Sequence, residues 1–78
     1  MSARGTVKTF TAYVEFDPVT NLYVGIVPGL PGAHTQGASL DELQKNLREV
    51  VELCLEEHPG DADDLPRFVG LQQIEVAV

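Results

Sequence analysis

One segment of this 78-residue chain repeats its apolar residues with the period of an α-helix, and signals at both ends bound it. Ser39 followed by Glu42 is typical of a capping box, in which the hydroxyl and the carboxylate satisfy free amides at the helix start. Pro59-Gly60 should end the helix near Glu57 or His58. The residues that fall on one apolar stripe are Leu40, Leu43, Leu47, Val50, Val51, Cys54 and Leu55.

Two segments before this helix alternate between two sides and predict β-strands at residues 6–16 and 21–27, and a short third strand is predicted at residues 33–37. Residues 17–21 contain Asp, Pro and Asn, which favour a turn, so the first two strands should form an antiparallel hairpin. In the second strand, the side that we expect to be buried consists of Leu22, Val24 and Ile26. The opposite side consists of Tyr23, Gly25 and Val27.

Two prolines and two glycines occur within residues 28–32, which excludes a helix or a central strand there. The segment is interpreted as a rigid turn whose glycines supply positive φ angles. A second interpretation is that the loop shapes a surface for a partner.

The chain returns to strand-like alternation at residues 68–78, after an acidic connection. A strand reached through a helix is normally parallel to its neighbour. The prediction is one α+β domain over residues 1–78, with element order β-β-β-α-β. One helix packs on a small mixed sheet of order 3-2-1-4, with the last strand beside the first.

Charge and composition restrict the function. Twelve acidic residues against five basic ones give a net charge of −7, which argues against direct nucleic-acid binding and favours a basic protein partner. A single cysteine excludes a disulfide framework. No apolar run is long enough to span a membrane and no signal peptide is evident, so a cytoplasmic protein is expected.

The order of motifs resembles the HicB family of antitoxins. The matching segments are residues 13–17, 22–28, 30–37, 39–43 and 46–47, which read YVEFD, LYVGIVP, LPGAHTQG, SLDEL and NL. The resemblance implies a partial ribonuclease-H-like fold, a small basic ribonuclease toxin of the HicA type as partner, and a dimer or tetramer.

The chain departs from the family pattern at Gly29, where an acidic residue is usual, and at Ala33, where cysteine is frequent. Many family members also carry a C-terminal DNA-binding module, and this chain ends at Val78 without one. Specific operator binding by this chain alone is therefore not expected.

Candidate partner-binding residues are Glu15, Asp17, Leu30 and His34, at the end of the first strand and around the loop. We expect no enzyme, no cofactor and no metal site. A metal-dependent nuclease needs several converging carboxylates, and the last strand offers only Glu75. The nuclease remains the alternative, together with a small-molecule-binding dimer and a HicB-like protein that has no toxin.

Two histidines and an acidic run allow further interpretations. His34 is either a base or metal ligand, or a structural residue, and His58 suits the negative end of the helix dipole. Asp61, Asp63 and Asp64 lack the ligand pattern of a calcium loop and should form a solvated acidic loop.

Self-association is expected because one helix covers only one face of a sheet. The uncovered face should include Tyr13, Tyr23, Val27 and Ala77. A two-fold homodimer through this face, or through the edge strand, is therefore the prediction.

Overall fold

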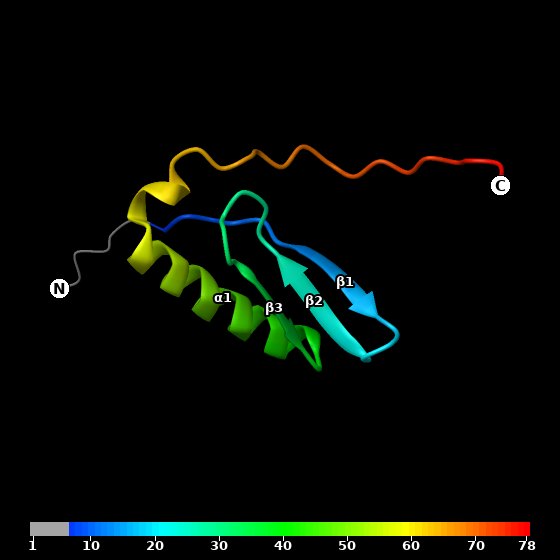
Figure 1. The fold of residues 1–78 in the computed structure, drawn as a ribbon, viewed down its shortest axis with the longest axis horizontal. Helices are drawn as coiled ribbons and strands as arrows, with labels where there is room; N and C mark the ends of the chain where they lie inside the picture. The colour runs from blue at the N-terminus through cyan, green and yellow to red at the C-terminus, as the bar shows by residue number, and fades with distance from the viewer. Residues whose placement is uncertain (1–6) are drawn as a thin grey trace.

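The alternating segments form a three-stranded antiparallel sheet in a computed structural model that describes residues 7–78, except the side chains of residues 61 and 62. The strands β1 (Tyr13–Asp17), β2 (Leu22–Ile26) and β3 (His34–Gly37) follow one another in the order β1-β2-β3 (Figure 1). The predicted order of the first three strands is confirmed. Residue 6, the predicted start of the first strand, and the side chain of Asp61 lie outside the described parts.

The predicted turn joins β1 to β2 with the residue types that turns favour. Asn21 adopts a φ of 59°, a left-handed conformation that asparagine tolerates better than most residues. Its amide donates to the Asp17 carbonyl at 2.8 Å, and the Val19 amide donates to the Asp17 carboxylate at 2.9 Å. One aspartate thereby closes the hairpin through both its backbone and its side chain.

The helix α1 (Leu40–Glu57) begins with the predicted cap. The Ser39 hydroxyl accepts a hydrogen bond from the Glu42 amide at 3.1 Å. The Glu42 carboxylate reaches back to the amide of Ala38, one residue before the cap, at 2.6 Å. His58 ends α1, and a short 3₁₀ turn, η1 (Pro59–Ala62), follows.

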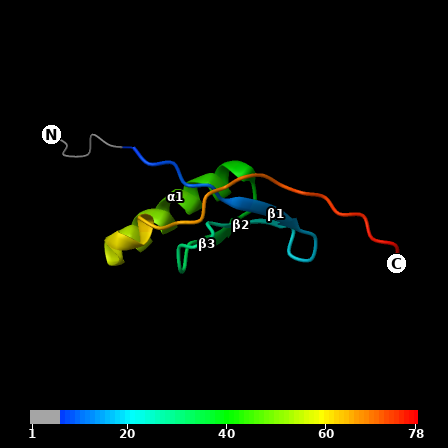
Figure 2. The same ribbon diagram turned by 90° about the horizontal axis from the view of Figure 1, so that it is seen from above.

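The core lies between α1 and the sheet, where the helix packs over β3 and β2 (Figures 1 and 2). The Asn46 amide nitrogen donates to the Gln36 carbonyl at 2.8 Å and ties α1 to β3. The half-buried Cys54 thiol donates to the Pro31 carbonyl at 3.4 Å and ties α1 to the loop. The buried apolar residues are Val27, Leu30, Ala33, Leu43, Leu47 and Val51.

The prediction for the orientation of β2 is wrong. Gly25 and Val27 are buried, whereas Val24 and Ile26 are exposed. A Cβ atom added at Gly25 would lie 3.0 Å from a Leu47 methyl carbon, so the glycine side of β2 is the side on which the helix packs. The absence of a side chain at this position lets α1 approach the sheet closely.

The predicted fourth strand is not part of the sheet within the single chain. Residues 68–78 are extended but unpaired, and they run away from the helix and the sheet (Figures 1 and 2). The radius of gyration is 14.9 Å, whereas about 11.5 Å is expected of a compact domain of this length. The predicted mixed sheet is therefore an antiparallel sheet whose edges are β1 and β3.

Candidate protein-binding face

The side of the sheet turned away from α1 carries three short rows of side chains. Residues paired directly across neighbouring strands point to the same side of a sheet. The first row is Tyr13, Ile26 and His34. The second row is Glu15, Val24 and Gln36, and the third is Asp17 and Leu22. We call these eight residues the open face.

The open face has an apolar centre and polar margins. Leu22, Val24 and Ile26 run down its middle on β2, and Ile26 is 48 % exposed. Glu15 and Asp17 lie on the β1 margin. An apolar strip with a polar rim is the usual anatomy of a protein–protein interface.

Three of the four predicted partner-binding residues lie together on this face. Glu15 and Asp17 lie on β1 and His34 lies on β3, and β2 runs between these two strands. The prediction for Leu30 is wrong because its side chain is only 3 % exposed and belongs to the core. The loop that carries Leu30 turns through Gly29 and Gly32, which have the predicted positive φ angles of 83° and 82°.

The residues predicted for a dimer interface do not share one surface. Tyr13 lies on the open face, but Tyr23 points to the helix side, where its ring meets Phe16 with centroids 5.1 Å apart. Val27 is only 4 % exposed and belongs to the core. Ala77 lies in the exposed C-terminal segment, away from the sheet. The placements of Tyr23 and Val27 follow from the reversed orientation of β2, and that of Ala77 follows from the unpaired last segment.

Sequence reasoning missed Val24 and Ile26 as surface residues. Both sides of β2 are apolar in sequence, so alternation alone does not say which side is covered. Gly25 was the available signal, because a residue without a side chain marks the side that another backbone approaches.

Two other features, a metal-binding cluster and a membrane-spanning helix, are absent from the described residues. Among residues 7–78, apart from the side chains of 61 and 62, no three His, Cys, Asp or Glu side chains gather closely enough to hold a metal ion. No helix in the described part of the chain is long and apolar enough to cross a membrane.

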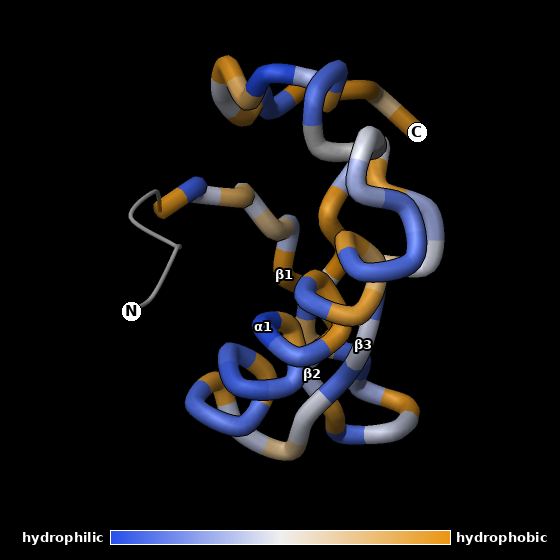
Figure 3. Tube along the Cα trace, turned by 90° about the vertical axis from the view of Figure 1, so that its left-hand side faces the viewer, coloured by the Kyte–Doolittle hydropathy of each residue, from blue (hydrophilic) through white to orange (hydrophobic). Residues whose placement is uncertain are grey.

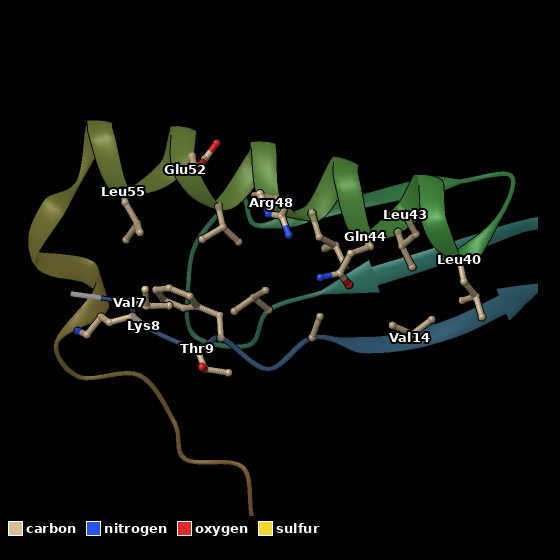
Figure 4. A pocket seen from close by; sticks show the side chains of 15 residues that line it. Val7, Lys8, Thr9, Val14, Leu40, Leu43, Gln44, Arg48, Glu52 and Leu55 are labelled. Carbon is tan, nitrogen blue, oxygen red and sulfur yellow. The ribbon is translucent and has the colours of Figure 1, made fainter. Parts of the chain in front are cut away.

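A second surface feature lies on the helix side of the sheet. A groove of about 660 Å³ runs between α1 and the extended N-terminal segment that leads into β1 (Figure 4). Leu40, Leu43 and Leu55 point into it from α1, and Val14 points into it from β1. Its walls are largely apolar, with Gln44, Arg48 and Glu52 along the helix.

Comparisons with known proteins place the chain among small proteins of similar length. It is 55 % identical over 69 residues to a UPF0150 protein of Thermotoga maritima, which covers 88 % of this chain and 91 % of that protein. It is 44 % identical over 69 residues to a UPF0150 protein of Synechocystis, with 88 % and 96 % covered. It is also 48 % identical over 67 residues to a UPF0150 protein of Archaeoglobus fulgidus, with 86 % and 93 % covered.

No family model matches the chain, and no solved structure matches it significantly. The three relatives share close to half of their residues or more with this chain, over most of both lengths. The chain belongs to the UPF0150 family.

Proposed function

We propose that this protein is a HicB-like antitoxin, a cytoplasmic binding protein that neutralises a small basic ribonuclease of the HicA type. The observation that carries the proposal is the open face, a sheet surface that α1 does not cover, with an apolar centre and carboxylates along one margin. The sheet and helix would then be a partial ribonuclease-H-like unit used for binding rather than for catalysis.

Charge supports a basic partner. The chain has a net charge of −7, and Glu15 and Asp17 lie beside the apolar strip of the open face. Opposite net charges accelerate the encounter of two proteins and disfavour partners of the wrong charge. The carboxylates would orient the toxin on the face, and they should affect the association rate more than the dissociation rate.

Affinity would come from the apolar centre. A few well-packed residues near the middle of an interface usually carry most of its binding energy. Val24 and Ile26 occupy this position, because each is flanked by a strand on both sides of β2. Their exposure in the free protein, followed by burial under a partner, is the source of the affinity in this proposal.

The first test of the proposal is whether a neighbouring gene encodes a small basic protein, and the second is calorimetry with that protein. Ile26→Asp should weaken binding at least about thirty-fold, since a central hot spot contributes about 2 kcal/mol or more. Leu53→Asp is the matched control, because Leu53 is equally exposed but lies on α1, far from the open face. The control should bind as the unchanged protein does.

Failure of the basic protein to bind, or equal binding by the two variants, would overturn the proposal. Magnesium- or manganese-dependent RNA cleavage by the chain alone would favour the nuclease alternative instead. A low-salt gel shift is expected to show no sequence-specific DNA retention by this chain.

A further inference from the structure

The last ten residues form an extended segment that no other described part of the chain covers. Residues 69–78, here called the C-terminal arm, are all exposed, and Ile74 and Val76 are 79 % and 71 % exposed. Apolar residues with this exposure are costly in water. We propose that the arm of one copy inserts into the helix-side groove of a second copy and pairs with its β1 edge.

The segment before the arm is attached to its own folded unit. Pro66 packs on Gly29, where an added Cβ atom would clash with the proline ring. The Phe68 ring meets the Tyr13 ring edge-on, with centroids 6.0 Å apart. These contacts fix where the arm leaves the domain, at the start of β1.

The arm then diverges from its own sheet. Its end lies beyond the β1–β2 turn in both ribbon views (Figures 1 and 2). In Figure 3 the apolar end of the chain is separate from the apolar residues between α1 and the sheet. The arm therefore leaves its own groove empty and is available to another molecule.

The groove has the features that a strand from another copy requires. β1 is an edge of the sheet, so the backbone groups along its outer side have no strand partner. Val14 points into the groove from β1, and Leu40 points into it from α1 (Figure 4). Their side chains nevertheless remain 45 % and 57 % exposed. A strand laid along β1 would cover both side chains.

The arm matches this groove in pattern, length and charge. Alternation places Ile74, Val76 and Val78 on one side and the single charged residue, Glu75, on the other. Ten extended residues reach about 33 Å, more than enough to follow a five-residue strand. Glu75 is the one charged side chain of the arm. Insertion of the arm therefore brings little of the net charge of −7 of each copy into the junction.

Exchange of arms satisfies two-fold symmetry, because each copy gives one arm and receives one. It also separates self-association from the proposed binding function. The groove lies on the helix side of the sheet, so an inserted arm would leave the central row of the open face, Glu15, Val24 and Gln36, accessible on both copies. A variant that loses dimerisation should keep its open face, and Ile26→Asp should remain dimeric.

Sedimentation velocity at micromolar concentration tests the exchange with the full chain. The unchanged protein should have twice the 8.5 kDa mass of one chain. Ile74→Asp should halve the measured mass while the helical circular dichroism stays unchanged, because Ile74 is 79 % exposed and lies outside the helix and the sheet. Gln73→Asp adds the same charge on the other side of the arm and should stay dimeric.

A mixing experiment separates arm exchange from pairing of two arms with each other. Val14→Asp disables the groove and should also give single chains. An equimolar mixture of Ile74→Asp and Val14→Asp chains restores one intact arm–groove junction and should recover a two-chain species. Pairing of arms alone would leave Val14→Asp dimeric.

The proposal is overturned if the unchanged protein is a single chain, if Ile74→Asp or Val14→Asp stays fully dimeric, or if the mixture stays monomeric. Loss of the dimer on Gln73→Asp as well would contradict one-sided insertion. Loss of toxin binding by Ile26→Asp in a protein that remains dimeric would support the separate use of the two surfaces.

Discussion

β2 and the C-terminal arm have the same kind of sequence but different surroundings. Leu22–Ile26 and residues 74–78 both alternate apolar residues with others over five positions. β2 lies between β1 and β3, whereas the arm has no strand neighbour in the single chain. The difference shows that alternation specifies an extended conformation. The extended segment becomes a strand only where the chain can bring it beside a free edge of the sheet.

The reach of each segment follows from its connections. A four-residue turn, residues 18–21, holds β2 beside β1, so pairing requires only a short loop closure. The arm follows an 18-residue helix and a connection that is attached to its own loop at Gly29. That attachment directs the arm past β1 rather than along it (Figure 1).

The largest expected difference between the folded unit and the arm is in the free energy of unfolding that a leucine-to-alanine substitution removes. Leu43→Ala removes the largest fully buried side chain and should lower the free energy of unfolding by about 2–5 kcal/mol. Leu71→Ala in the arm should change it by less than about 0.5 kcal/mol. Urea unfolding in the Ile74→Asp background measures both without a contribution from association. A similar loss for Leu71→Ala would mean that the arm packs on its own domain.

Gly37 and Gly70 differ in how closely other atoms of the protein approach their backbone. An added Cβ atom at Gly37 would lie 2.7 Å from the Leu43 backbone nitrogen, whereas nothing lies within 4 Å of one at Gly70. Gly37→Ala should therefore cost about 1–3 kcal/mol, and Gly70→Ala should be neutral or slightly stabilising in the single chain. Thermal unfolding of both variants in the Ile74→Asp background, at the same concentration, is the measurement. A tolerated Gly37→Ala would show that α1 and β3 can separate.

The helix cap tests a contact that is local in sequence. Ser39→Ala removes the acceptor for the Glu42 amide and should lower stability by about 0.5–2 kcal/mol. Ser39→Asp keeps an acceptor at the same place and should restore most of the loss. If the urea midpoints of the two variants coincide, the cap is not what starts the helix.

The smallest expected effect concerns the link between α1 and the edge strand β3. Asn46→Ala removes the hydrogen bond to the Gln36 carbonyl and should cost about 0.5–1 kcal/mol, because alanine partly offsets the loss by its helix propensity. Lys45→Ala, on the neighbouring exposed helix position, is the control. Hydrogen exchange of β3 amides should increase in the Asn46 variant and not in the control.

Much of the local structure could be predicted from sequence because its signals involve neighbours along the chain. The cap at Ser39, the end of α1 near Glu57 and the turn after Asp17 all depend on residues within four positions. Alternation also predicts that Glu15 and Asp17, two positions apart on one strand, share a side of the sheet, whereas the side of His34 was known only from the register of β2 and β3. The part of the site at Leu30 was not predictable in this way, because its burial depends on helix packing.

The sequence by itself determined one capped amphipathic helix, a hairpin, a short third strand and a final extended segment. Only the tertiary structure decided which side of β2 faces the helix, because both sides are apolar and the close approach of Leu47 to Gly25 makes the choice. It also decided that the last segment leaves the sheet. The physical reason is the same in both cases: alternation describes a strand's two sides, whereas burial depends on the surface that lies opposite.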